Sequence, residues 1–213
     1  MSKWPVLLLA SFLFLAPGTA QAASLQLPAP DTKGGAPLMQ ALDARKSSRN
    51  FTSKPLSDKL LGDLLWAACG VNRPDGRRTI PTALNRHDIE IYVLRGDGAW
   101  RYDATGHTLE QVSTSDLRRF LGGQTFAREA PATLLYVSDA KKNSNAQYAA
   151  LHTGSAYQNV GLFCASVGLN NVVRASYDAA ELASGLGLPE SKRIIISQTV
   201  SYTHLTLPTK TIV

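Results

Sequence analysis

Apolar residues recur at helical spacing in five segments of the chain. In residues 57–70, leucine and alanine residues line one face, Ser57 suits the N-cap position, and Gly70 suits the end of the helix. In residues 145–169, the longest of the five, small residues recur at intervals of three, four or seven and so form one stripe. Pro37 favours the first turn of a helix over residues 37–46. Shorter helices are expected at residues 115–121 and 178–186.

Runs of β-branched and aromatic residues predict strands between these helices. A Gly-Asp-Gly turn joins residues 89–94 to residues 99–102, which predicts a hairpin. Further strands are expected at residues 132–138, 171–175 and 193–200. Because helices and strands alternate without a repeated βαβ unit, the pattern predicts an α+β fold in which helices cover a mainly antiparallel or mixed sheet.

The first 22 residues have the pattern of a secretory signal peptide. Lys3 precedes an apolar run over residues 6–16, and an Ala-Gln-Ala triplet at residues 20–22 suits cleavage. The alternative is a membrane anchor, but a spanning helix needs about 20 apolar residues, and this run is shorter and is followed by a Pro-Gly pair. We therefore expect a periplasmic or secreted protein without a stable membrane anchor. Residues 23–36 are expected to form an extended arm before a domain over residues 37–200.

The composition is that of a globular protein with scattered charge. The chain has 213 residues, of which 44% are hydrophobic and 18% charged, and this argues against intrinsic disorder. The net charge is +6, but the basic residues form no long run with interleaved aromatic residues, so no nucleic-acid partner is expected. Cys69 and Cys164 lie in apolar helical segments and are expected to be buried thiols, although an oxidising compartment would permit a disulfide. Neither belongs to a metal-binding pattern.

Three short segments carry candidate binding chemistry. Residues 45–49 combine two guanidinium groups, an ammonium group and two hydroxyl groups, which suits a phosphate, although cations also gather at helix ends because of the helix dipole. Residues 81–85 could contact a polar ring or a ribityl-like chain, or form only a turn. In residues 154–159, Gln158 and Asn159 point about 100° apart, so at most one of them faces a given partner.

Motifs for side-chain catalysis are missing from the sequence. The four histidines are dispersed, Asp88 and Glu90 are expected on the same face of a strand, and the chain lacks the nucleophile-elbow, Walker, zinc-protease and dinucleotide-binding motifs. This favours either a binding protein or an enzyme whose chemistry belongs to a cofactor.

Five segments in order resemble the nitroreductase superfamily of FMN-dependent oxidoreductases, in particular its small SagB-like branch. They are residues 45–51 (RKSSRNF), similar to R-R-S-x-R-x-F; 64–72 (LLWAACGVN), similar to L-L-W-A-A-x-G; 78–85 (RTIPTALN), similar to R-x-x-P-S-A-x-N; and 154–159 (GSAYQN) followed by 165–169 (ASVGL), similar to G-x-x-x-Q-N and A-x-x-x-G-L. The resemblance covers residues 38 to about 200.

The resemblance implies a three-layer α-β-α sandwich and an obligate homodimer with one FMN in each of two clefts between the subunits. The cofactor-binding residues that it implies are Arg45, Ser47 and Arg49 at the phosphate and ribityl end, Pro81, Thr82, Ala83 and Asn85 in a loop lining the flavin, and Val173, Arg174 and Ala175 beside the isoalloxazine edge. No catalytic side chain and no metal is expected, because the flavin carries the two-electron, ping-pong chemistry.

The sequence departs from the family pattern in the binding loop and at the C-terminus. Thr82 stands where the family usually has Ser, Leu84 where it has Gly or Thr, and His87 where it has Gln. The last strand should continue into Gly-Tyr-Pro, whereas residues 201–213 read SYTHLTLPTKTIV. We interpret this tail as non-native sequence; the alternative is a native arm whose alternating Thr and Leu residues pair as an edge strand.

The leading hypothesis is therefore an exported FMN-dependent oxidoreductase that acts on a nitroaromatic, a quinone or a peptide-derived group. The electron donor stays open, because a periplasmic enzyme would meet little NAD(P)H. One alternative is a flavin-binding or scavenging protein with the same fold and no turnover. Another is a secreted structural module without flavin.

Overall fold

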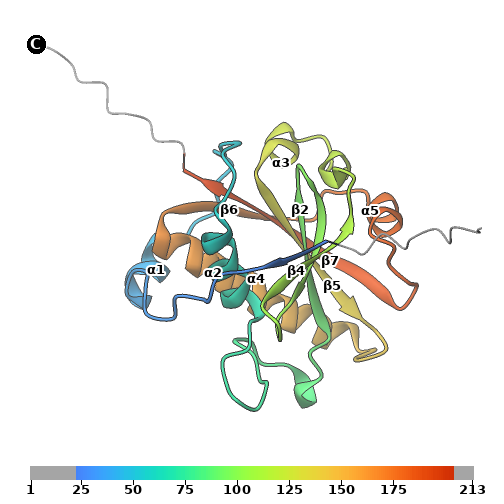
Figure 1. The fold of residues 1–213 in the computed structure, drawn as a ribbon, viewed down its shortest axis with the longest axis horizontal. Coiled ribbons are helices and arrows are strands. Elements are labelled where there is room, and N and C mark those ends of the chain that lie inside the picture. The colour runs from blue at the N-terminus through green and yellow to red at the C-terminus, as the bar shows by residue number, and fades with distance from the viewer. Residues whose placement is uncertain (1–22, 204–213) are drawn as a thin grey trace, which may run out of the picture.

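The computed structural model describes residues 23–203, which form a seven-stranded sheet with helices on both faces (Figure 1). Every strand pairing is antiparallel, and the order across the sheet is β1-β4-β3-β2-β5-β7-β6. The strands are β1 (Ser24–Gln26), β2 (Ile89–Arg95), β3 (Gly98–Asp103), β4 (Thr108–Ser113), β5 (Ala132–Asp139), β6 (Leu169–Arg174) and β7 (Lys192–Tyr202). The expected signal peptide at residues 1–22 lies outside the described residues.

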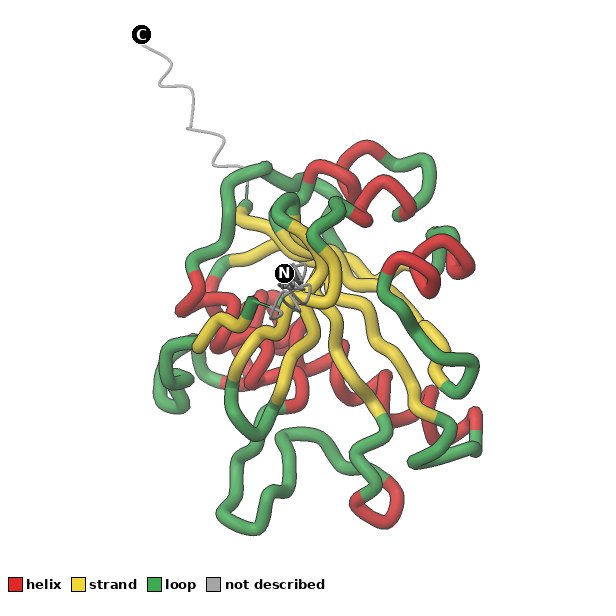
Figure 2. Tube along the Cα trace, turned by 45° about the vertical axis from the view of Figure 1, so that its right-hand side comes forward, coloured by secondary structure: helices red, strands yellow, loops and turns green. Residues whose placement is uncertain are grey.

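Two hydrophobic cores, one on each face of the sheet, make the fold a three-layer α-β-α sandwich. Figure 2 shows helices on both sides of the sheet. One side carries α1 (Leu38–Ala44), α2 (Asp58–Cys69) and α4 (Ala146–Val167), and the other carries η2 (Leu117–Phe120), α3 (Thr125–Glu129) and α5 (Ala179–Gly185). Along β2, Ile89, Ile91 and Val93 enter the first core whereas Tyr92 and Leu94 enter the second, as expected for a strand buried on both faces. The expected α+β sandwich is confirmed.

The two long helices begin and end where the sequence predicts. Ser57 and Asn145 each accept a hydrogen bond from a backbone N–H of the first turn, in α2 and α4 respectively. Helix α4 ends at Gly168, which has the left-handed φ of 74°. Gly70 ends α2 for a different reason: a Cβ at this position would lie 2.7 Å from Trp66 Cα, so only glycine permits this close approach.

The predicted hairpin of β2 and β3 is confirmed, and two unexpected strands extend the sheet beyond it. Strand β4 forms a second hairpin with β3. The sequence did not indicate this strand, because its apolar residues Leu109 and Val112 are three positions apart rather than two. Strand β1 lies within the expected extended arm and pairs with β4 at the edge of the sheet.

Strand β7 continues past residue 200, where the domain was expected to end. Ser201 pairs with Asn170 and Tyr202 with Leu169, and Thr203 forms an isolated bridge with Phe51. The first three residues of the expected tail therefore pair with the domain, and residues 204–213 lie outside the described part of the chain. Among the described residues, no helix has the length and apolar character needed to cross a membrane.

Candidate functional site

The cationic segment at residues 45–51 is fixed against the edge strand β6. The Ser48 N–H donates to Asn171 O at 2.9 Å, and Asn170 Nδ2 donates to Asn50 O at 2.7 Å. These bonds join a segment that follows α1 to a strand about 120 residues later in the chain. The sequence alone could not indicate this contact.

The cations of this segment have no carboxylate partner among the residues that the structure describes. Arg45, Lys46 and Arg49 are exposed, and none of them is ion-paired with a carboxylate within residues 23–203. The stem of Arg45 passes over Gly161 of α4, where a Cβ would lie 3.7 Å from Arg45 Cγ. The charged donors, together with the exposed Ser47 hydroxyl, are thus open to an anionic ligand.

Strand β6 ends at Arg174, a buried arginine near Arg49. Its Nε donates to Gln124 Oε1 and its Nη2 to Leu121 O, both at 2.9 Å, whereas Nη1 is buried and has no hydrogen-bond partner in the described part of the chain. The guanidinium group lies over the Phe126 ring, 5.3 Å from its centroid. Burial, and then the charge of Arg49, lower the pKa of Arg174 below its ordinary value. Two neighbouring cations and an unsatisfied donor favour a ligand that accepts hydrogen bonds.

The other two candidates of this segment flank Arg174. Val173 is half-buried, and Ala175 is exposed directly after the strand. The structure therefore brings Arg45, Ser47 and Arg49 to the same edge of the sheet as residues 173–175.

The candidate binding loop at residues 81–87 has an unusual backbone. Leu84, Asn85 and His87 have φ values of 53°, 54° and 48°, in the left-handed region that costs a non-glycine residue roughly 1–2 kcal/mol. Thr82 Oγ1 accepts a hydrogen bond from the His87 N–H at 3.2 Å, and Asn85 Oδ1 lies 2.6 Å from His87 Nε2. Burial, followed by the charges of nearby Arg78 and Lys142, lowers the pKa of His87. Such strain persists only where surrounding contacts hold the backbone, which is typical of functional loops.

The accessibility of the loop candidates differs. Thr82 and Ala83 are half-buried, whereas Pro81 and Asn85 are exposed. Leu84, the residue between Ala83 and Asn85, is 82% exposed.

A buried polar pair beneath this loop was missed in the sequence. Asp88 is fully buried, and its Oδ1 lies 2.6 Å from Nδ1 of His152 on α4. The other ring nitrogen of His152 accepts the backbone N–H of Ala83 at 2.8 Å. The sequence does not indicate this pair, because 64 residues separate Asp88 from His152 in the chain. A histidine within an otherwise apolar helical segment was the only available signal.

The two groups of candidate residues do not meet within one chain. Both border α4: the loop is attached at His152, whereas Arg45 lies over Gly161, nine residues further along the helix. At a rise of 1.5 Å per residue, these positions are about 13 Å apart along the helix axis. One chain thus presents two partial sites at the two ends of this helical stretch.

In the third candidate segment, residues 154–159, one amide side chain joins two helices and the other is exposed. Asn159 Nδ2 donates to Ala67 O at 3.0 Å and so joins α4 to α2. Gln158 is exposed. The expectation that only one of these amides faces a given partner fits this geometry.

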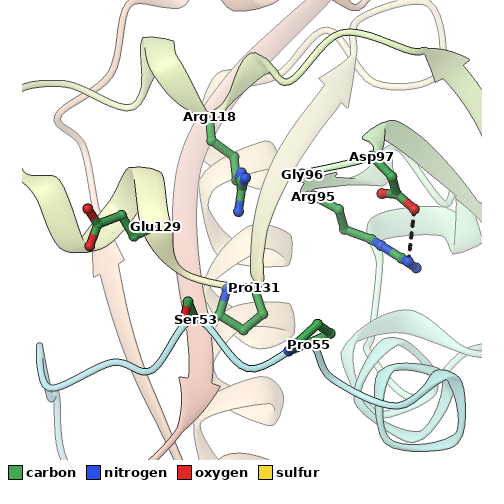
Figure 3. A pocket seen from close by; sticks show the side chains of 8 residues that line it. All are labelled: Ser53, Pro55, Arg95, Gly96, Asp97, Arg118, Glu129 and Pro131. Atoms are coloured by element: carbon green, nitrogen blue, oxygen red, sulfur yellow. Dashed lines mark hydrogen bonds and ion pairs between the residues drawn. The ribbon is translucent and has the colours of Figure 1, made fainter.

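A separate cavity of about 400 Å³ lies beside the turn between β2 and β3 (Figure 3). Arg95, Arg118 and Glu129 line it, and Figure 3 shows Arg95 directed toward Asp97. Arg95 pairs with Asp97 at 3.0 Å, and Arg118 pairs with Asp116 at 2.6 Å. Because carboxylates of the same chain neutralise both arginines, this cavity is a poorer anion site than residues 45–49.

The cysteines and the metal-ligating side chains offer no alternative chemistry. Cys69 and Cys164 are free and buried, which confirms the expectation of buried thiols. Burial raises the pKa of Cys69 to about 11 and that of Cys164 still further, so neither is an activated nucleophile. The described residues contain no group of three or more His, Cys, Asp or Glu side chains that could hold a metal ion.

Comparison with known proteins gives a consistent result. The model of the Nitroreductase family matches residues 42–202. A candidate nitroreductase of Methanocaldococcus jannaschii is 29% identical over 158 residues, which are 66% of this chain and 80% of that protein.

Solved structures agree with the sequence comparisons. The crystal structure of a candidate nitroreductase from Ralstonia eutropha JMP134 is 38% identical and covers 88% of this chain and 92% of its own, with a TM-score of 0.80. A candidate nitroreductase from Desulfovibrio desulfuricans, solved in complex with FMN, is 21% identical and covers 79% of this chain and 87% of its own, with a TM-score of 0.61. The latter likeness concerns the fold.

Proposed function

Because the chain belongs to the nitroreductase family, we propose that it is an FMN-dependent oxidoreductase that carries out two-electron chemistry on a small organic substrate. The observation that carries this proposal is the set of exposed cations at residues 45–49, which have no carboxylate partner within residues 23–203. One of these cations, Arg49, is near the buried Arg174, and all of them lie inside the region that the family model matches. A ligand with both a phosphate group and a polar ring would pair with the cations of residues 45–49 and accept a hydrogen bond from Arg174.

The residues present fit FMN. Arg45, Ser47 and Arg49 would hold its phosphate and ribityl end with charge-assisted hydrogen bonds. The unsatisfied Nη1 of Arg174 would donate to an acceptor atom of the ring, with Val173 and Ala175 beside it. In the loop whose entry Pro81 fixes, the side chains of Thr82, Ala83 and Asn85 would line the other side of the flavin.

The protein's part in the chemistry is binding and electrostatics. Bound FMN would supply the two-electron redox chemistry, with donor and acceptor using one face of the ring in turn. Arg174 would place positive charge beside the ring and favour its reduced, electron-rich form. The donors of residues 45–49 would hold the cofactor in one orientation, so that the same face stays open to both reactants. This division of labour requires no catalytic side chain.

We propose that the site is completed by a second copy of the chain. The loop at residues 81–85 and the cations at residues 45–49 form two partial sites on α4, so the loop of one protomer would meet the cations of its partner. Exposed apolar side chains accompany both parts: Leu38 and Met39 on α1 are 63% and 74% exposed, and Leu151 on α4 is 58% exposed. Burying such a surface in a homodimer would stabilise it by the hydrophobic effect.

We also propose that the protein is exported, on the strength of the signal-peptide pattern in residues 1–22. In an extracytoplasmic compartment, a quinone or a peptide-derived group is as suitable a reactant as a nitroaromatic, and NAD(P)H is scarce. Fractionation of cells that produce the full chain tests this proposal: processed protein in the periplasm or medium supports it, and an unprocessed chain in the cytoplasm contradicts it.

Turnover distinguishes an enzyme from a flavin-binding protein of the same fold. The FMN-loaded protein is reduced anaerobically with dithionite, and a nitroaromatic, a quinone or an aromatic peptide acceptor is then added. We expect at least one acceptor to restore the oxidised flavin spectrum faster than it does with free FMN at equal concentration. Bound flavin that no acceptor reoxidises faster than free FMN would favour the scavenging role and contradict the enzymatic one.

A further inference from the structure

The buried pair of Asp88 and His152 lies directly beneath the loop at residues 81–87. Asp88 has no solvent-exposed surface, and His152 is 6% exposed. Asp88 Oδ1 lies 2.6 Å from His152 Nδ1, and Asp88 Oδ2 accepts a hydrogen bond from Asn143 Nδ2 at 3.1 Å. The Tyr148 ring stacks on the imidazole at a centroid distance of 6.1 Å. The carboxylate and the imidazole are therefore held in one orientation.

The hydrogen bonds define the tautomer of His152. Its Nε2 accepts the Ala83 N–H at 2.8 Å, and a ring nitrogen that accepts a hydrogen bond carries no proton. The proton of the neutral ring then sits on Nδ1 and is donated to Asp88. An ionised carboxylate can only accept, so Asp88 enforces the one tautomer that can bind the loop backbone.

The bond to Ala83 is the anchor of a strained segment. Leu84, Asn85 and His87 have left-handed backbone conformations. The other hydrogen bonds described for residues 82–87 are local, such as Asn85 N–H to Thr82 O at 3.0 Å, or exposed and long, such as Lys142 Nζ to His87 O at 3.5 Å. Without the acceptor on α4, little in the described structure would hold this backbone conformation.

We propose that His152 and Asp88 are positioning residues for the cofactor: they fix the loop in the conformation in which Thr82 and Asn85 contact the flavin. The proposal rests on the proposed FMN-binding function. It also assigns the role of Ala83 more closely, because the Ala83 N–H is used by His152 and so cannot donate to a ligand.

The test measures FMN affinity by quenching of flavin fluorescence in the full-length protein. His152→Leu removes the acceptor and should raise the Kd for FMN about tenfold or more, since it leaves the Ala83 amide unpaired. His152→Gln can place an amide oxygen near the position of Nε2 and should restore affinity to within about threefold of the wild type. His107→Asn is the control, because His107 also bonds to backbone, at Pro28 O, but away from the loop. It should leave the Kd unchanged.

A second readout does not depend on flavin. In the ligand-free protein, ¹⁵N NMR should show His152 with a protonated Nδ1 and an unprotonated Nε2, and Asp88→Asn should weaken this preference together with FMN affinity. A wild-type protein that binds no FMN would overturn the proposed function, and this proposal with it. If the wild type binds FMN and all three folded variants, His152→Leu, His152→Gln and Asp88→Asn, bind it with the wild-type affinity, the positioning role alone is overturned. If His152→Leu fails to fold, the other two variants decide. FMN affinity close to that of the wild type in His152→Gln, together with weakened affinity in Asp88→Asn, supports the proposal. Weakened affinity in His152→Gln, together with wild-type affinity in Asp88→Asn, overturns it.

Discussion

At the scale of single residues, burial separates the polar groups that can react from those that only support the fold. Cys69 and Cys164 are fully buried, and the pKa of the Cys69 thiol is raised to about 11. Because the thiolate is the reactive form, we expect Ellman's reagent to label neither cysteine in the native protein at neutral pH. Two thiols per chain should react after unfolding without reductant. Unfolded protein that reacts only after reduction would instead show that the cysteines form a disulfide.

Glu90 provides a residue-scale prediction on pH. Lys192 Nζ donates to Glu90 Oε2 at 2.7 Å, and Lys142 lies 3.6 Å from the other oxygen. Burial acts to raise the pKa of Glu90, but the Lys192 hydrogen bond and the two ammonium charges outweigh it, so the net pKa lies below 4.5. A carboxyl whose pKa is lower in the folded state stabilises the fold above its unfolded pKa, and the contribution is lost as pH falls through the folded value.

Glu90→Gln should therefore lower the free energy of unfolding by about 1 kcal/mol at neutral pH and by less as the pH approaches 3. Urea unfolding at a series of pH values measures this. Asp75→Asn, which removes the exposed partner of Arg77, is the control and should have almost no effect at any pH. A Glu90→Gln effect that grows on acidification would contradict the assigned direction.

At the scale of elements, helix ends and turns could be predicted from the sequence, whereas contacts between distant segments could not. The caps of α2, the bounds of α4 and the turn between β2 and β3 were predicted because each depends on nearby residues. Strand β4 was missed because its partner strand, not its own periodicity, fixes it. The contact of His152 with Asp88 was missed because only the packing of α4 on the sheet brings the two together. Side-chain chemistry indicated residues 45–49 and 81–85 as candidate binding segments, and the resemblance to a family supplied their roles and added residues 173–175, which no periodicity could have identified.

Gly154 in α4 and Gly168 at its C-cap are expected to respond to alanine substitution with opposite changes in stability. Gly168 has a φ of 74°, so Gly168→Ala should destabilise the protein by about 1 kcal/mol. Gly154 lies inside the helix, and a Cβ there would meet only the Tyr157 ring at 3.9 Å, so Gly154→Ala should stabilise the protomer by about 0.5–1 kcal/mol. Thermal unfolding of both variants at equal protein concentration checks the signs. A destabilised Gly154→Ala protomer would mean that this face of α4 is packed against something absent from a single chain.

At the scale of the whole molecule, the proposed site needs two copies of the chain. Leu38→Glu places a charge on the exposed apolar surface of α1 and should weaken dimer formation at least about tenfold, and FMN affinity with it. Val112→Glu is the matched control, because Val112 is an exposed apolar residue on β4, near the edge of the sheet opposite to β6 and the cationic segment. Sedimentation velocity with and without FMN measures both effects. A wild-type protein that binds FMN as a monomer would contradict the shared site.

The most direct test of the central claim is the absorbance spectrum of the purified protein after incubation with FMN and desalting. The wild type should retain the flavin bands. Arg45→Ala/Arg49→Ala should lose them through a rise in Kd of at least about 100-fold, because two charge-assisted contacts to the phosphate are removed. Lys141→Ala/Arg193→Ala removes the same charge from exposed positions outside the site and should retain the bands. A folded wild-type protein that stays colourless, or a double arginine variant that binds FMN as well as the wild type, would contradict the assignment of this site.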